Sequence, residues 1–207
     1  TIIVAAVVYT YVVAEDDQCI QPSATQSMIN ETIKNIQFKQ RSDHSDVRTD
    51  VIFLIDNTRG FKECLTQIRQ LMMKTVALLK DTLKVGDDAW PKGIRVGIYS
   101  FASYAVADLK LEAGTSWENI KTAVSDLRTH GRSDVGGMTD IVHSLDSVYD
   151  VLNASILAED KAKRNVIVLI SDGDQNDPKG LPINVRLTAD LLSVGLGAFL
   201  NASYLNR

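Results

Sequence analysis

The sequence predicts an α/β fold: a doubly wound, mainly parallel central sheet with helices on both faces. The first indication is a pair of short runs, VIFLI at 51–55 and VIVLI at 166–170, which are apolar at every position. Continuous apolar runs of this length are typical of strands buried on both sides. The second indication is that apolar residues recur at three- and four-residue steps between such runs, as in amphipathic helices. Strands that alternate with helices at this spacing form parallel sheets.

The elements can be placed in order from Thr49 onward. After the strand at 51–55, the apolar positions within 64–79 predict a helix, and Gly and Pro mark 84–93 as a loop. The stretch IRVGIYSF at 94–101 predicts the next strand. The remaining expected elements are helices at 115–127 and 141–152 and strands at 166–170 and 191–196.

The helix expected at 115–127 carries a start signal. Thr115-Ser-Trp-Glu118 has the spacing of a capping box, in which a hydroxyl and a carboxylate three residues apart each accept a hydrogen bond from a backbone N–H. We therefore expect Thr115 to cap this helix and Glu118 to bond back toward it.

The N-terminal stretch TIIVAAVVYTYVVA is almost wholly apolar and gives way to acidic residues at Glu15. It is too short to span a bilayer and resembles the apolar segment of a secretory signal, with a small residue before the change. We interpret 1–14 as a truncated signal peptide; the alternatives are a buried N-terminal strand and a truncated membrane anchor. Residues 15–48 are expected to form a polar leader with a short helix near 27–38. Residues 49–207 are expected to form the main domain, without its last helix.

Composition excludes one functional class and points to export. The net charge is −4 and no patch is rich in Lys and Arg, which argues against a nucleic-acid-binding protein. Three Asn-x-Ser/Thr tripeptides, at Asn30, Asn153 and Asn201, are candidate glycosylation sites. Cys19 and Cys64 are candidates for one disulfide, and a buried free thiol at Cys64 is an equal alternative. We therefore expect a secreted protein whose mature chain is not inserted in a membrane.

Three polar loops are expected to meet at one edge of the sheet. Asp56 and Thr58 directly follow the first strand. Asp172 follows the VIVLI strand, and Thr139 precedes the third helix. In open α/β sheets, ligands bind beyond the carboxyl ends of the strands, near the point where the strand order reverses. Carboxylate and hydroxyl oxygens suit Mg²⁺ or another small divalent cation. Because hydroxyl ligands are neutral, the ion would keep much of its positive charge and could bind a carboxylate of a partner molecule.

Five segments occur in the order and spacing of the von Willebrand factor type A domain, to whose superfamily the integrin I domain belongs. The segments are VIFLIDNTRGF, IRVGIYSFAS, GGMTDIVHSL, NVIVLISDGD and LLSVGLG. The resemblance covers residues 49–207. It implies an extracellular adhesion module that binds a protein or matrix ligand at the carboxyl edge of the sheet.

The same resemblance implies a metal-ion-dependent adhesion site for Mg²⁺ or Mn²⁺. The family's site has an Asp-x-Ser-x-Ser motif after the first strand, a Thr in a later loop and an Asp after the fourth strand. By this resemblance, the matching positions are Asp56, Thr58, Thr139 and Asp172. Gly60 stands where the second Ser belongs, so one direct oxygen ligand is lost and water must replace it.

Two other interpretations of these residues remain open. In the first, the site has decayed and its Asp and Thr side chains only cap loops and helix starts, which gives a metal-independent structural or matrix module. In the second, the cation of Arg59 pairs with one of the carboxylates and takes the place of the ion. The neighbouring Asp174 and Asp177 are solvated loop charges or supplement the ion's shell.

A phosphoryl-transfer enzyme has to be weighed against the binding module. Haloacid-dehalogenase-like phosphatases and ion-pumping ATPases also place an Asp after an apolar strand and have a later acidic Gly-Asp-Gly-x-Asn-Asp loop. The phosphatase pattern requires Asp where Thr58 stands, and the pump pattern requires Gly where Arg59 stands. Two residues separate Gly173 from Asn176 where the pattern allows one. No Ser/His/Asp or Cys/His arrangement is apparent either, so we do not expect an enzyme.

Overall fold

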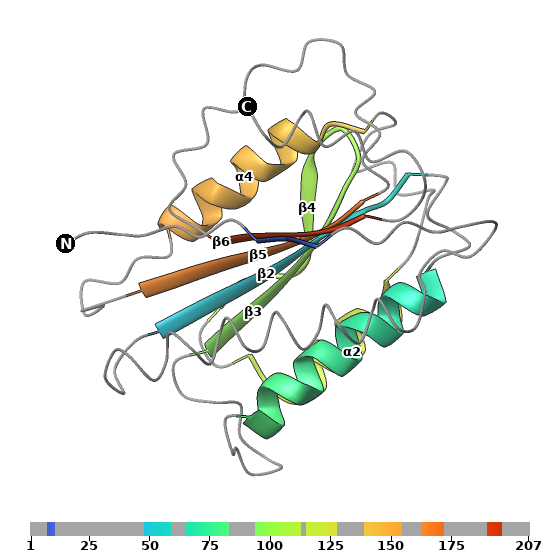
Figure 1. Ribbon diagram of the computed structural model, residues 1–207, viewed down its shortest axis with the longest axis vertical. Helices are drawn as coiled ribbons and strands as arrows, with labels where there is room; N and C mark the ends of the chain where they lie inside the picture. The colour runs from blue at the N-terminus through green and yellow to red at the C-terminus, as the bar shows by residue number, and fades with distance from the viewer. Residues whose placement is uncertain are drawn as a thin grey trace.

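The computed structural model describes residues 8–10, 48–58, 65–82, 94–112, 115–127, 139–154, 163–171 and 190–195. The strands are β1 (Val8–Thr10), β2 (Arg48–Asp56), β3 (Ile94–Phe101), β4 (Ala105–Leu109), β5 (Lys163–Ser171) and β6 (Asp190–Gly195). The helices are α2 (Leu65–Thr82), α3 (Trp117–Asp126) and α4 (Ile141–Ala154). A six-stranded sheet lies between α4 on one face and α2 on the other (Figure 1). The predicted α/β fold is confirmed.

The order of the strands places β2 inside the sheet and defines a switch point. The order is β1-β6-β5-β2-β3-β4. β2 pairs in parallel with β3 on one side and with β5 on the other, and β6 continues in parallel beyond β5. The chain winds outward from β2 to β3 and β4, and then in the opposite direction from β5 to β6. The winding therefore reverses between β2 and β5, where open sheets of this kind bind ligands.

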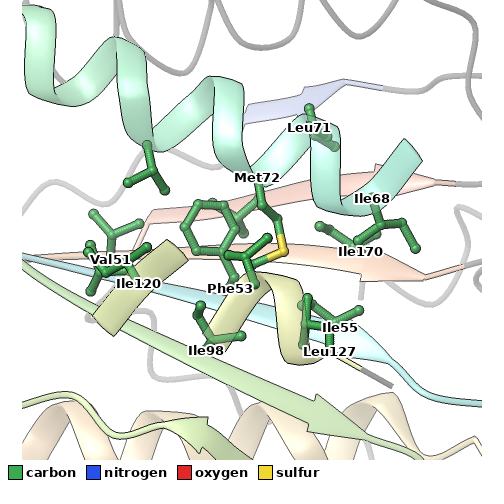
Figure 2. Close-up of a cluster of buried hydrophobic side chains, with 14 of the residues drawn as sticks. Val51, Phe53, Ile55, Ile68, Leu71, Met72, Ile98, Ile120, Leu127 and Ile170 are labelled. Carbon is green, nitrogen blue, oxygen red and sulfur yellow. The ribbon is translucent and has the colours of Figure 1, made fainter. Parts of the chain in front are cut away.

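Each face of the sheet has its own hydrophobic core, because side chains of a strand alternate between the two faces. On one face, Val51, Phe53 and Ile55 of β2 pack against α2 and α3 (Figure 2). On the other face, Ile52 and Leu54 pack against α4. All five β2 side chains are at most 2% exposed. Full burial of one such side chain contributes about 1.5–3 kcal/mol, so β2 anchors both layers.

The strands β2 and β5 begin earlier than their apolar runs predicted, at Arg48 and Lys163. The added residues are polar but lie in register, with Asp50 opposite Arg95 on β3 and Asn165 on β5. The Arg95 guanidinium donates two hydrogen bonds to the Asp50 carboxylate, 2.7 Å from Nε and 2.5 Å from Nη2. Both residues are buried. This ion pair compensates the buried charge of Asp50 and so accounts for the polar beginning of β2.

The strand β4 was not predicted. It pairs antiparallel with β3, with an irregularity between Ile98 and Tyr99. Its sequence, AVADL, has neither a continuous apolar run nor a clear alternation of apolar and polar residues. All five of its residues are half-buried. The sheet is therefore mainly parallel with one antiparallel edge strand, which is common in large α/β sheets.

Helix α3 is capped one residue later than predicted. The prediction of a capping box formed by Thr115 and Glu118 is therefore wrong. Ser116 is the N-cap, and its Oγ accepts a hydrogen bond from the backbone N of Asn119 at 3.1 Å. The Thr115 hydroxyl instead donates to a backbone carbonyl three residues earlier, at 3.0 Å. Glu118 forms an ion pair with Lys121. Both Thr115 and Ser116 carry a hydroxyl that could cap the helix, but the Thr115 hydroxyl is bonded to the residue three positions earlier.

The N-terminal apolar segment contributes the edge strand β1. Its three residues pair in parallel with β6, from Val8 opposite Leu192 to Thr10 opposite Val194. The structure describes these three residues as a strand, and the assignment of 1–14 as a whole stays untested. The other residues of 1–14 and the helix expected near 27–38 lie outside the described residues, so removal of 1–14 as a signal peptide stays a prediction.

Candidate functional site

The candidate site lies at the switch point, where β2 and β5 end side by side. Asp56 is the last residue of β2, and Ser171 is the last residue of β5. The register pairs Ile55 with Ile170, so the next residue of each strand, Asp56 and Ser171, also lie together. Both follow an apolar residue that faces α2 and α3, so their side chains are on the α4 face of the sheet.

The Asp56 carboxylate is held from two directions. The backbone N–H of Thr58 donates to Oδ1 at 2.9 Å, which closes a turn of the Asx type. The Ser171 hydroxyl donates to Oδ2 at 3.0 Å. The Asp56 residue is 0% exposed, so these bonds offset part of the free-energy cost of burying its oxygens and fix their direction. The acid after this strand is therefore a fixed, buried group and not a solvated turn residue.

Two backbone hydrogen bonds bring the two candidate threonines to the same end of the sheet. The N–H of Asn57 donates to the carbonyl of Phe101, the last residue of β3, at 2.7 Å. The N–H of Asp140 donates to the next carbonyl, that of Ala102, also at 2.7 Å. The candidate threonines are the chain neighbours of Asn57 and Asp140. Because Asn57 and Asp140 are bonded to consecutive carbonyls, Thr58 and Thr139 lie at the same carboxyl edge of the sheet, which we call the rim.

The start of α4 holds Thr139 in place. Asp140 caps this helix, because its Oδ1 accepts a hydrogen bond from the backbone N of His143 at 2.9 Å. Thr139 precedes the cap and is 1% exposed, whereas Thr58 is half-buried. One of the two candidate hydroxyls thus belongs to a fully enclosed residue and the other to a residue that water reaches.

Three of the four predicted ligand positions, Asp56, Thr58 and Thr139, lie on this rim. The fourth, Asp172, directly follows the last residue of β5 but is outside the described residues. The other site residues outside them are Gly60, Arg59, Asp174 and Asp177. The complete set of ligands, and the alternative in which Arg59 replaces the ion, therefore stay predictions.

The features that predicted export are mostly outside the described residues. They include the sequons at Asn30 and Asn201 and both cysteines, Cys19 and Cys64. Asn153 lies in α4, one residue before its end. Among the helices that the structure describes, none is both long and apolar enough to cross a membrane.

The donors present fit a hard divalent cation. A carboxylate and two hydroxyls are oxygen ligands of the type that Mg²⁺ and Mn²⁺ prefer. Among the described residues, no group of three or more His, Cys, Asp or Glu side chains gathers as a metal cluster. Asp56, Thr58 and Thr139 therefore suit an ion that retains part of its water shell.

Ser171 is the member of the site that sequence reasoning missed. It ends an apolar run, and the family motif draws attention to Asp172 instead. Its side chain is 3% exposed and meets Asp56 only because β2 and β5 are neighbours in register. Strand order and register cannot be predicted from a single sequence. The only feature that could have indicated Ser171 was a hydroxyl at the end of a buried strand.

A doubly wound sheet with a fixed carboxylate and two threonines at its switch point defines a class of α/β proteins that bind ligands at the carboxyl edge. Residues 50–197 match the family model of the von Willebrand factor type A domain. The chain belongs to this family, as its resemblance implied. Domains of the family generally mediate contacts with other proteins or with matrix.

Solved structures share the fold at low sequence identity. An aerotolerance-related membrane protein of Bacteroides fragilis is 16% identical, with a TM-score of 0.52 and 72% of this chain and 68% of that chain covered. The protein BatB of Bacteroides thetaiotaomicron is 15% identical, with a TM-score of 0.50 and coverages of 71% and 66%. Proximal thread matrix protein 1 of the mussel byssus is 21% identical, with a TM-score of 0.50 and coverages of 72% and 38%. These similarities show the fold alone.

Proposed function

We propose that this domain binds a protein or extracellular-matrix ligand at the carboxyl edge of its sheet, through a divalent cation. The observation that carries the proposal is the buried Asp56 carboxylate, fixed by Thr58 and Ser171 at the switch point. Burial of a charged group costs free energy, and a turn that needed only an acceptor for the Thr58 N–H could use the neutral amide of Asn instead. In this proposal the domain acts outside the cell as a binding module and not as an enzyme.

Four side chains would hold the ion. Thr58 and Thr139 offer hydroxyl oxygens, and Asp56 and Asp172 offer carboxylates that act through water. When bound, Mg²⁺ or Mn²⁺ supplies a positive charge that attracts a carboxylate of the ligand. Gly60 provides no hydroxyl where the family motif has its second Ser, so we expect weaker ion binding than in a domain with the complete motif.

Thermal melting in the presence and absence of the ion tests the proposal. Mg²⁺ or Mn²⁺ should raise the melting temperature of the chain above its value in EDTA, because a ligand that binds only the folded state stabilises it. At one hundred times the dissociation constant the gain is about 2.7 kcal/mol. The Asp56→Asn variant keeps the shape of the side chain but lacks its charge, so its melting temperature should no longer respond to the ion.

The matched control is Asp146→Asn, which removes the same charge from an exposed position on α4. Its response to the ion should equal that of the wild type. The ligand part of the proposal is tested with the ion-loaded protein and a short peptide that carries one glutamate. This peptide should bind in Mg²⁺ and not in EDTA, and its glutamine counterpart should bind in neither. A wild-type melting temperature that is unchanged by both ions would leave a metal-independent matrix module as the better account.

A further inference from the structure

We propose that Ser171 is a positioning residue of this site, which sets how Asp56 meets a cation and thereby which cation the site prefers. The inference rests on the proposed function, because it concerns the same ion. It adds a residue that neither the family motif nor the sequence analysis assigned to the site.

The contact between Ser171 and Asp56 is enclosed and made across the switch point. The hydroxyl of Ser171 donates to Oδ2 of Asp56 at 3.0 Å, and the two residues are 3% and 0% exposed. The partners are 115 positions apart in the chain, so the bond joins the ends of two different strands. A hydrogen bond to a charged acceptor in such an enclosed place is stronger than one on the surface.

This bond limits the ways in which Asp56 can act on a cation. Oδ1 already accepts the N–H of Thr58, and Oδ2 accepts the hydroxyl of Ser171. A carboxylate with a donor on each oxygen is poorly suited to chelate an ion through both oxygens at once. Ca²⁺ takes six to eight oxygen ligands and often uses a carboxylate in this bidentate way, whereas Mg²⁺ keeps several of its waters. The Ser171 hydroxyl therefore disfavours Ca²⁺ relative to Mg²⁺.

The same bond ties the end of β2 to the end of β5, because Asp56 ends the first of these strands and Ser171 ends the second. Any movement of the end of β5 relative to β2 has to stretch or break this bond. Asp56 and Ser171 thus behave as one unit before an ion arrives.

The test compares Ser171→Ala with the wild type in melts over a range of Mg²⁺ and of Ca²⁺ concentrations. In the wild type, half of the stabilisation should need more Ca²⁺ than Mg²⁺. Loss of the hydroxyl frees Oδ2, so the ratio of the two half-saturating concentrations should fall about fivefold, the equivalent of roughly 1 kcal/mol. Ser171→Thr retains a hydroxyl and should restore the ratio.

Ser144→Ala is the matched control. Ser144 is 0% exposed and lies in α4, and its hydroxyl makes no hydrogen bond within the described structure. The control removes the same atom from an equally buried place but does not affect Asp56. It should leave the ratio unchanged and should not lower the melting temperature in EDTA.

A second measurement in EDTA examines the bond without any ion. Ser171→Ala should lower the melting temperature by about 2–8 °C, and this loss should disappear when Asp56 is already Ala. An equal loss in both backgrounds overturns the inference. An ion response in the wild type with an unchanged Mg²⁺ to Ca²⁺ ratio in Ser171→Ala also overturns it and leaves the proposed function intact. A wild type that responds to neither ion overturns the proposed function and the inference together.

Discussion

At the scale of single residues, Gly97 shows how closely the α4 face of the sheet is packed. A Cβ placed on Gly97 would lie 3.0 Å from Cε2 of Tyr99, 3.3 Å from Cβ of Leu111 and 3.4 Å from Cγ1 of Ile52. Tyr99 has little room to move, because it is buried and its phenol is bonded to the backbone of Leu111. Burial, the largest influence, raises the pKa of Tyr99, and the Leu111 bond opposes this effect. Glycine is therefore required here for close approach.

Gly97→Ala is expected to destabilise the domain by about 1–3 kcal/mol, because the added methyl group overpacks a closed core. Urea unfolding monitored by fluorescence measures the change. A glycine that is replaceable without strain would instead give a gain of a few tenths to about 1 kcal/mol from the reduced entropy of the unfolded chain. Gly97→Ala combined with Tyr99→Leu should lose less than the sum of the two single variants, since the second change removes the ring that the methyl group meets.

The residue scale also shows what sequence reasoning can and cannot reach at this site. Asp56, Thr58 and Thr139 were predicted because their types and order match a family motif. The position of Ser171 could not be predicted, because its role depends on which strands are neighbours. Ser116 was missed for a different reason: Thr115 next to it has the same capping chemistry, and only the backbone decides between them.

At the scale of elements, the ion pair of Asp50 and Arg95 joins the early parts of β2 and β3. Both side chains are buried and bonded through two oxygens and two nitrogens. Removal of one partner from such a pair leaves a buried charge, whereas replacement of both with apolar side chains is often neutral. We therefore expect the pair to specify register more than it adds stability.

Arg95→Met is expected to lower the free energy of unfolding by about 3–5 kcal/mol, since the Asp50 carboxylate loses its bidentate partner. The double variant Asp50→Val with Arg95→Met should recover most of this loss. Chemical denaturation of the two variants and of the wild type provides the comparison. A double variant as unstable as Arg95→Met would show that the pair contributes net stability in its own right.

The elements differ in how well the sequence predicted them, and the reason is the local pattern. The strand at 94–101 was predicted with the bounds that the structure gives, and α4 begins at the predicted Ile141. Strands β2 and β5 were predicted too short because both begin with polar residues, and in β2 the Asp50 carboxylate is neutralised only across the sheet, by Arg95. The edge strand β4 has small and acidic residues, and its pairing with β3 is a property of the tertiary fold.

At the scale of the whole molecule, ion binding and folding are linked. An ion that binds only the assembled rim raises the stability of every part of the domain by the same free energy. The sequence reached the α/β class and the family because five motifs keep their order over most of the chain. It could not predict whether the site binds an ion, because Gly60 offers no hydroxyl where the family motif has its second Ser.

Gly60→Ser is expected to strengthen the response of the whole domain to the ion. The restored hydroxyl should allow the same rise in melting temperature at a lower Mg²⁺ concentration, by about tenfold if one oxygen ligand contributes roughly 1.4 kcal/mol. Melts at graded Mg²⁺ concentrations measure this shift. If the variant and the wild type respond at the same concentration, the departure at position 60 is not what limits binding.

The bond between Asp56 and Ser171 has a consequence for the order of folding events. Its two partners are 115 positions apart, so the rim closes only after β5 has docked beside β2. Contacts between such distant parts of a chain form slowly, because a long loop has to be ordered first. A nascent chain that ends within α4 already contains both threonines and Asp56, but it lacks β5 and therefore the Ser171 hydroxyl that bonds to Asp56. In the proposed function, capture of a ligand therefore requires a chain whose synthesis has passed β5.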